Sequence, residues 1–571
     1  MQAQTRLLVR HFVRGYLSTD LAGGERQAAL SSALLVSPGL FTIVVLSSKY
    51  VMTPFPAPGH SALAGFADRL LIFGASMVIM ALVAVVQWDR LSLDARDASI
   101  LGVLPLRHGQ VVQAKWMATA LFAGAAALLL NGIPSLIYPI MSVGRLEANW
   151  LLIVQLTALQ LVLGVLSGLL GFLIVLTVRE GLLALLGARL FARISPAVQA
   201  SFVVVGLLAF FLQPPFALRA LRDGHPSARW LPAVVLAGAF EELGGHRVAV
   251  LPAAPLPKRV ASRAVLVLDQ YRTALRHAQG SARRTALGAS GLCLFLATVL
   301  FWNNRRRLEA PVMAARGTRG TRALARLVWR GVAPRPETRA GASFAWRTLL
   351  RSQRHRLLLA VGLAAGLAAG AVGIFQEPRR GASLADANLV LLSVQGLVVA
   401  SMAAGVRAAL RRTADNSATW LFAVAWTGGR APYESGAALA SWFIISLPVV
   451  VLMPLWWSVL GAEAAVIHAL VGLALARSLA DVIALTLGTL PLVDDAVPSE
   501  SARALPVLGV PAVVMGATML ASAERWSAVT TIAVLLTLAA GFRVARLWRR
   551  VPGEPIMPAA GEPSVALSLN E

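Results

Sequence analysis

The chain has 571 residues, of which 57% are hydrophobic and 14% charged, with a formal net charge of +25. A soluble chain of this length would need charged surface on every domain, so this balance excludes an ordinary soluble protein. Uncharged stretches of about 20 residues, enough to cross the hydrocarbon core as a helix, recur along the sequence. Since lipid cannot satisfy backbone hydrogen bonds, we expect an all-α, polytopic membrane protein.

The excess of basic residues indicates anchoring at one membrane surface rather than nucleic-acid binding. The single cysteine, Cys293, excludes a disulfide within the chain, and no Cys/His cluster has metal-ligand spacing. No metal, no cofactor and no nucleic-acid partner is therefore expected. The lipid bilayer is the first expected partner.

The first predicted element is residues 5–17, TRLLVRHFVRGYL. Its apolar residues pair at a spacing of four, and its arginines fall on the opposite side. This pattern predicts an amphipathic helix that lies in the membrane interface and does not cross it.

About twelve transmembrane helices follow, in two six-span halves. The predicted spans of the first half are residues 28–48, 70–87, 116–142, 150–178, 198–218 and 285–302. Those of the second half are residues 357–375, 388–406, 436–460, 463–489, 504–522 and 527–545. The first five matching pairs start at similar offsets, which predicts a repeat of the kind common in transporters.

The predicted domains follow from these spans. They are a first half at 1–302 with an extracellular insertion at 219–284, a basic linker at 303–356, a second half at 357–546, and a tail at 547–571. The linker holds 14 arginines, so it is expected to be cytoplasmic, and counting spans outward places both termini on the same side. It ends in a second amphipathic stretch at 344–356, which predicts another interfacial helix.

Within the insertion, residues 230–245 are apolar but too short to span a membrane, and Glu241 and Glu242 lie near their end. This segment predicts a re-entrant or interfacial helix on the outer face. The alternative is an ordinary helix in an extracellular loop.

The loop after the second span, residues 88–116, combines both charge signs with a proline break. Asp94, Arg96 and Asp97 fall in a short amphipathic helix, and Leu104-Pro105 ends it because the residue before proline avoids helical angles. Lys115 follows at the predicted membrane surface. Such a helix suits docking to a partner protein, although a plain cytoplasmic loop would look similar.

Arg477 and Asp481 lie four residues apart inside the tenth span. Charges within a membrane are costly and by default indicate function, here a proton or substrate path. The alternative is a structural pair that shields itself between helices. No nucleophile–base–acid set accompanies it, so no catalytic residues and no enzyme activity are expected.

The string RDASILGVLPLRHGQVVQAK resembles the cytoplasmic loop of the membrane-spanning permeases of bacterial ABC exporters. The stretches 344–360 and 405–422 resemble large permeases of this type as well. In that family the loop contacts a separate ATPase subunit, which implies a docking role for the residues that match it: Asp94, Arg96, Asp97, Leu104, Pro105 and Lys115. The counterpart at 411–430 lacks the Leu-Pro break, and the second half lacks a re-entrant segment.

The resemblance implies a permease in the bacterial plasma membrane, working as a homodimer or as a pseudo-two-fold monomer. None of the three lysines lies in a phosphate-binding loop, so ATP would bind only to a P-loop ATPase partner. One alternative is a proton-coupled secondary transporter of the major facilitator kind, although the loop WDRLSLDARD lacks that family's glycines. Another alternative is a non-transporting membrane scaffold.

Overall fold

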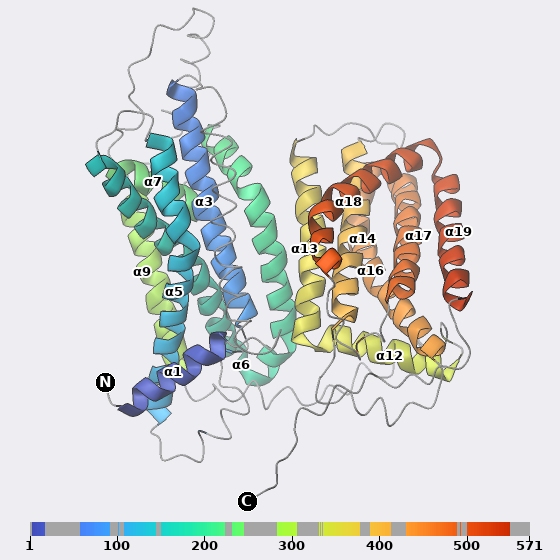
Figure 1. Ribbon diagram of the computed structural model, residues 1–571, viewed down its shortest axis with the longest axis horizontal. Coiled ribbons are helices and arrows are strands. Elements are labelled where there is room, and N and C mark those ends of the chain that lie inside the picture. The colour runs from blue at the N-terminus through green and yellow to red at the C-terminus, as the bar shows by residue number, and fades with distance from the viewer. Residues whose placement is uncertain are drawn as a thin grey trace, which may run out of the picture. The chain divides into compact units, whose positions relative to one another are not determined.

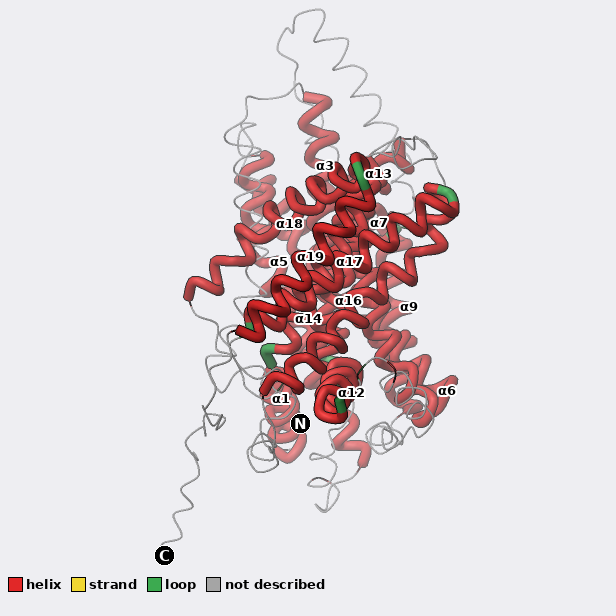
Figure 2. The backbone as a smooth tube through the Cα atoms, turned by 90° about the vertical axis from the view of Figure 1, so that its right-hand side faces the viewer, coloured by secondary structure: helices red, strands yellow, loops and turns green. Residues whose placement is uncertain are grey.

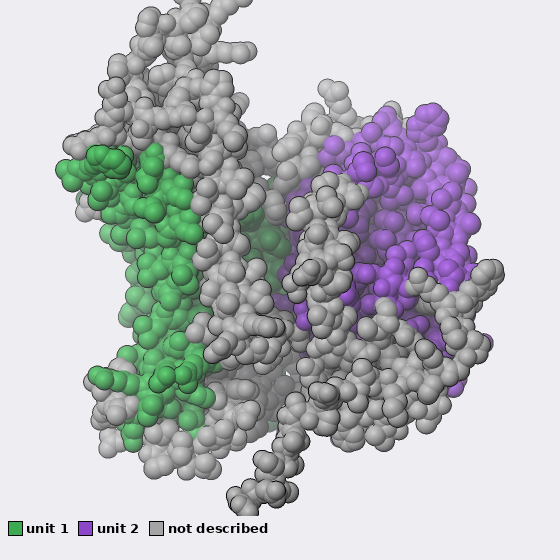
Figure 3. All heavy atoms as spheres, viewed as in Figure 1, with its two compact units in different colours: residues 1–317 green, residues 318–571 purple. Residues whose placement is uncertain are grey.

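In its described part, the computed structural model of the chain is built of helices (Figure 1), and no strand occurs there (Figure 2). The structure describes residues 3–17, 58–88, 90–91, 101, 108–143, 150–222, 231–244, 282–304, 331, 333, 335–376, 389–412, 430–487, 492 and 500–548. The chain divides into two compact units, residues 1–317 and 318–571 (Figure 3). It is a multi-pass helical membrane protein, which confirms the predicted class.

Eight of the described helices contain a segment long and apolar enough to cross a membrane. These segments are Gly65–Val86, Gly109–Ile140, Trp150–Phe191, Arg284–Asn303, Leu389–Leu410, Ala431–Leu460, Ala462–Thr486 and Ala528–Ala545. Each coincides with a predicted span. Of the other four predictions, 198–218 and 357–375 overlap shorter apolar helices, 504–522 falls in a helix without such a segment, and 28–48 lies outside the described residues. A twelve-span arrangement therefore stays a prediction.

The first unit contains six labelled helices in its described part. They are α1 (Ala3–Leu17), α3 (Pro58–Val86), α5 (His108–Val143), α6 (Trp150–Arg222), α7 (Pro232–Gly244) and α9 (Ala282–Asn303). Helix α6 has 73 residues and would measure about 110 Å if straight. Ile153 near its start nevertheless shares a buried cluster with Ala217 near its end, so the helix doubles back. The predicted spans 150–178 and 198–218 correspond to its two arms, the segments before and after the bend.

The bend in α6 lies at Gly187, whose backbone adopts φ 67° and ψ 167°. Glycine is essentially the only residue that adopts these angles, and a side chain there costs about 1–3 kcal/mol, so Gly187→Ala should destabilise the unit by that amount. Gly181→Ala is a matched control, because its Cβ would meet only Leu300 at an ordinary 3.9 Å. Thermal unfolding of the two detergent-solubilised variants measures the difference. Equal midpoints would show that the bend does not depend on the glycine.

The second unit contains seven labelled helices in its described part. They are α12 (Pro336–Arg351), α13 (Gln353–Gln376), α14 (Leu389–Leu410), α16 (Arg430–Leu460), α17 (Ala462–Thr486), α18 (Glu500–Trp526) and α19 (Ala528–Trp548). Gly461 alone, at φ 82°, separates α16 from α17, which confirms the predicted break there. The predicted amphipathic helix at 344–356 is only partly right, since Ser352 is extended and ends α12. Residues 353–356 begin α13 instead.

Each unit places an amphipathic helix against the helix that covers its third predicted span. Helix α1 packs on α5 in the first unit, and α12 packs on α16 in the second (Figure 1). The two receiving helices also share two internal prolines, Pro134 and Pro139 in α5 and Pro448 and Pro454 in α16. This common plan agrees with duplicated halves.

Candidate functional site

The predicted docking loop is described mainly at its two ends. Asp94, Arg96, Asp97, Leu104 and Pro105 lie outside the described residues. Trp88 and Arg90 at the first end are described, and so is Lys115 at the second. These ends show what the loop is attached to.

Trp88, directly after α3, anchors the first end of the loop to α6. Its indole Nε1 donates a hydrogen bond to Ser195 Oγ at 2.8 Å, and its ring stacks on Phe191. Arg179 Nε donates to the Trp88 carbonyl oxygen at 3.0 Å. All of these side chains are buried. The start of the loop is therefore attached to both arms of α6.

The same end of the loop also holds α1. Gln87 Nε2 donates to the Tyr16 carbonyl oxygen at 3.3 Å, and the Arg90 guanidinium donates to the carbonyl oxygen of Gly15. Both acceptors lie in the last turn of α1, where carbonyl groups lack partners within the helix. Side chains near the loop thus complete the C-terminal end of α1.

Lys115 holds α1 from the second end of the loop. Its ammonium lies 4.6 Å from the ring centroid of Phe12 and 4.9 Å from that of Tyr16, within the range of cation–π attraction. Lys115 is 4% exposed, so its side chain is buried against α1. The docking role that the resemblance implies for it stays a prediction.

A hydrogen bond supports this contact. Thr119 Oγ1 donates to the Lys115 carbonyl oxygen at 2.9 Å, so the Tyr16 hydroxyl is the donor in its 2.8 Å bond to Thr119. Burial raises the pKa of Tyr16 well above its ordinary value, which keeps that proton in place. We call the connected set Tyr16, Trp88, Arg90, Lys115, Thr119 and Arg179 the loop-stem cluster.

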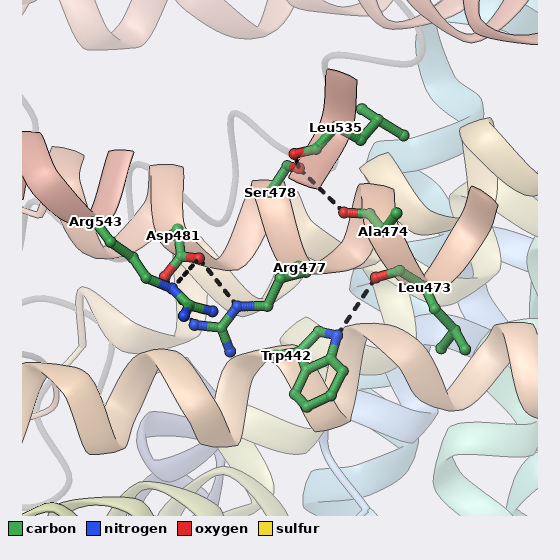
Figure 4. A network of polar contacts seen from close by, with 8 residues as sticks. All are labelled: Trp442, Leu473, Ala474, Arg477, Ser478, Asp481, Leu535 and Arg543. Atoms are coloured by element: carbon green, nitrogen blue, oxygen red, sulfur yellow. Dashed lines mark hydrogen bonds and ion pairs between the residues drawn. The ribbon is translucent and has the colours of Figure 1, made fainter. Parts of the chain in front are cut away.

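Arg477 and Asp481 form the predicted pair on α17, and Arg543 of α19 completes it (Figure 4). Arg477 binds the carboxylate through Nε at 3.0 Å and through Nη2 at 3.1 Å, while Arg543 Nε lies 3.0 Å from it. Asp481 is 1% exposed. With two guanidinium groups on one buried carboxylate, the geometry favours the structural interpretation, a link between α17 and α19.

The first unit holds a related arrangement. Glu180 lies on α6 two residues beyond the fourth predicted span, pairs with Arg179, and accepts a hydrogen bond from Asn304 Nδ2 at 2.9 Å. Asn304 directly follows α9, which covers the sixth predicted span, just as Arg543 comes from the helix of the twelfth. In each unit, therefore, the last described helix or its end supplies a partner for an acid on the helix that covers the fourth predicted span of that half.

Helix α7 confirms the helix predicted within 230–245. Residues 233–241 are all buried, and the helix packs on α3, α6 and α9, which does not fit an ordinary loop helix. Glu241 forms an ion pair with Arg69 of α3. The two side chains are 5% and 4% exposed. The sequence pattern singled out Glu241 but did not indicate its partner Arg69, which lies 172 positions earlier.

A further buried pair joins α17 to α18. His468 Nδ1 lies 2.7 Å from Glu524 Oε1, and both residues are at most 3% exposed. Sequence reasoning missed this pair, although a histidine within an apolar span was the available signal.

Comparison with known proteins places the chain in no family: no family model, no curated protein and no solved structure matches it. Functional inference therefore depends on the residues and contacts described above.

Proposed function

We propose that this chain is the membrane-spanning permease of an ATP-driven exporter of the ABC type, energised by a separate P-loop ATPase subunit. It would lie in a bacterial plasma membrane, with the loop 88–116 and both termini on the ATPase side. The observation that carries the proposal is the loop-stem cluster, which ties both ends of that loop to the helices of the first unit.

A loop that docks a motor transmits movement only if its ends are firmly held. Here Trp88 hydrogen-bonds to Ser195 and Arg179 of α6. Arg90, at one end of the loop, and Lys115, at the other, both contact α1. A displacement of the loop would therefore move α1 and α6 together. These contacts suit a permease driven from outside the membrane.

A proton-coupled secondary transporter is the second candidate, and one observation favours it. The His468–Glu524 pair is a buried titratable pair of the kind that proton relays use. The ATPase distinguishes the two candidates, since a secondary transporter would need none.

The test is a pull-down of a co-expressed ATPase subunit by the charge-reversal variant Asp94→Arg/Asp97→Arg. Removing one side of a desolvated charge pair costs about 2–5 kcal/mol, so binding should weaken roughly 30-fold or more. Reversal of Arg379, in a predicted outer loop, is the matched control. The unaltered chain alone should hydrolyse no ATP.

A third variant, Lys115→Met, separates docking from transmission. Because Lys115 lies under α1, this variant should retain the ATPase while losing the cation–π contact. If Asp94→Arg/Asp97→Arg and the Arg379 control capture the ATPase equally well, the loop is not the docking site and the proposal fails.

A further inference from the structure

Four helices of the second unit meet around His468. The residue itself lies on α17, Glu524 comes from α18, Trp456 from α16 and Gln395 from α14. The Trp456 and His468 rings meet edge to face with centroids 4.9 Å apart. Gln395 Nε2 donates to the backbone carbonyl oxygen of His468. The imidazole thus contacts Trp456 and its ionisable neighbour Glu524, and Gln395 binds the backbone beside it.

The ion pair that the structure shows at this site joins His468 to Glu524. On the same helices, Glu463 and Arg525 are exposed. Arg543, on α19, binds Asp481 instead. His468 and Glu524 are therefore the ionisable groups of this buried contact.

Three buried polar atoms around the pair have no hydrogen-bond partner in the described part of the chain. They are His468 Nε2, Gln395 Oε1 and Trp456 Nε1. Buried polar atoms without a partner are rare and call for an explanation. A protonated imidazole carries a donor at Nε2 as well as at Nδ1.

From this geometry we infer that His468 and Glu524 form a proton-binding site that controls the packing of α18 on the second unit. With one proton the pair is an imidazolium and a carboxylate and carries no net charge. Loss of that proton leaves a buried carboxylate beside a neutral ring, which is costly because an isolated charge is poorly solvated there. A second proton removes the carboxylate charge and leaves the imidazolium unpaired.

The stabilisation from this pair is present while the single proton is bound, and it is lost as the pH rises and the proton leaves. Helix α18 then loses its charge-assisted link to α17. The site requires neither an ATPase nor loop docking, so the inference can be tested independently of the proposed function.

The first experiment measures thermal unfolding of the full chain in nanodiscs as a function of pH. Glu524→Gln keeps an acceptor oxygen for His468 Nδ1 but cannot ionise, and Arg525→Gln is the matched control at the exposed neighbouring position. The midpoint difference between wild type and Glu524→Gln should change by about 5 °C between roughly pH 6 and pH 8.5. The control should follow the wild type. If the midpoint difference between wild type and Glu524→Gln is the same at every pH, the pair acts only as a hydrogen bond and the inference is wrong.

A second measurement reports on α18 itself. In a Cys293→Ser background, a cysteine is placed at Ala521, which is 1% exposed and lies one turn before Glu524. The rate at which a thiol reagent labels this cysteine should rise more steeply with pH when Glu524 is present than when it is replaced in Glu524→Gln. The thiol's own pH dependence is the same in both proteins, so it cancels in the comparison. Identical pH profiles would show that α18 does not respond to the proton.

Discussion

Replacing Arg69 with alanine is expected to destabilise the first unit by about 3–5 kcal/mol, because it removes one member of the buried Arg69–Glu241 ion pair. Arg69 binds Glu241, donates to the Tyr138 hydroxyl at 3.1 Å, and lies 4.8 Å from the ring centroid of Phe240. It thereby joins α3 to α5 and α7. Thermal unfolding of the purified chain measures the loss.

Two further variants show whether charge is the cause. Arg69→Met/Glu241→Leu replaces both charges by apolar groups and should recover most of the stability, since the cost of Arg69→Ala lies mainly in the buried carboxylate that loses Arg69. Glu242→Gln changes the exposed neighbouring carboxylate and should alter the midpoint little. An equal loss in Arg69→Ala and in the double variant would attribute the effect to packing alone.

Gly171→Ala should have the second largest effect, about 2–3 kcal/mol, the upper part of the range for overpacked cores. Gly171 lies where α6 crosses α3, and a Cβ there would press into the backbone of Met77, 2.8 Å from its carbonyl carbon. Backbone cannot move aside as a flexible side chain would. The two helices would have to separate.

Gly124→Ala in α5 is the control, because a Cβ at that position meets nothing within 4 Å. It should be neutral or slightly stabilising, since alanine is the better helix former. Unfolding midpoints of both variants test the contrast. A loss of similar size in Gly124→Ala would indicate a general effect of the substitution and not of the crossing.

The features that local spacing determines were predictable from the sequence. Residues 5–17 show their apolar spacing directly, and the structure places a helix at Ala3–Leu17 with Leu8, Phe12 and Tyr16 buried and Arg10 exposed. The break between spans 436–460 and 463–489 also appears at Gly461. Helix periodicity and chain-breaking residues act over a few positions, so one sequence is enough to see them.

Partners that meet through folding were not predictable. The i,i+4 spacing identified Arg477 and Asp481, but Arg543 lies 62 positions away and binds the same carboxylate. Glu524 lies just beyond the predicted span 504–522, where an acidic residue indicates only the end of a span. Such pairs depend on how helices pack, which the hydrophobic pattern of each helix does not specify.

The packing of α1 on α5 has a consequence for the order of events while the chain is synthesised. Tyr16 hydrogen-bonds to Thr119, 103 positions later, so α1 leaves the ribosome well before its binding site exists. At about 5–20 residues per second, that interval is roughly 5–20 seconds. Throughout it, the basic, amphipathic α1 has only the lipid surface on which to bury Leu8 and Phe12. Nascent α1 should therefore bind the membrane surface first and then transfer its apolar face from lipid to α5 once α5 has been inserted.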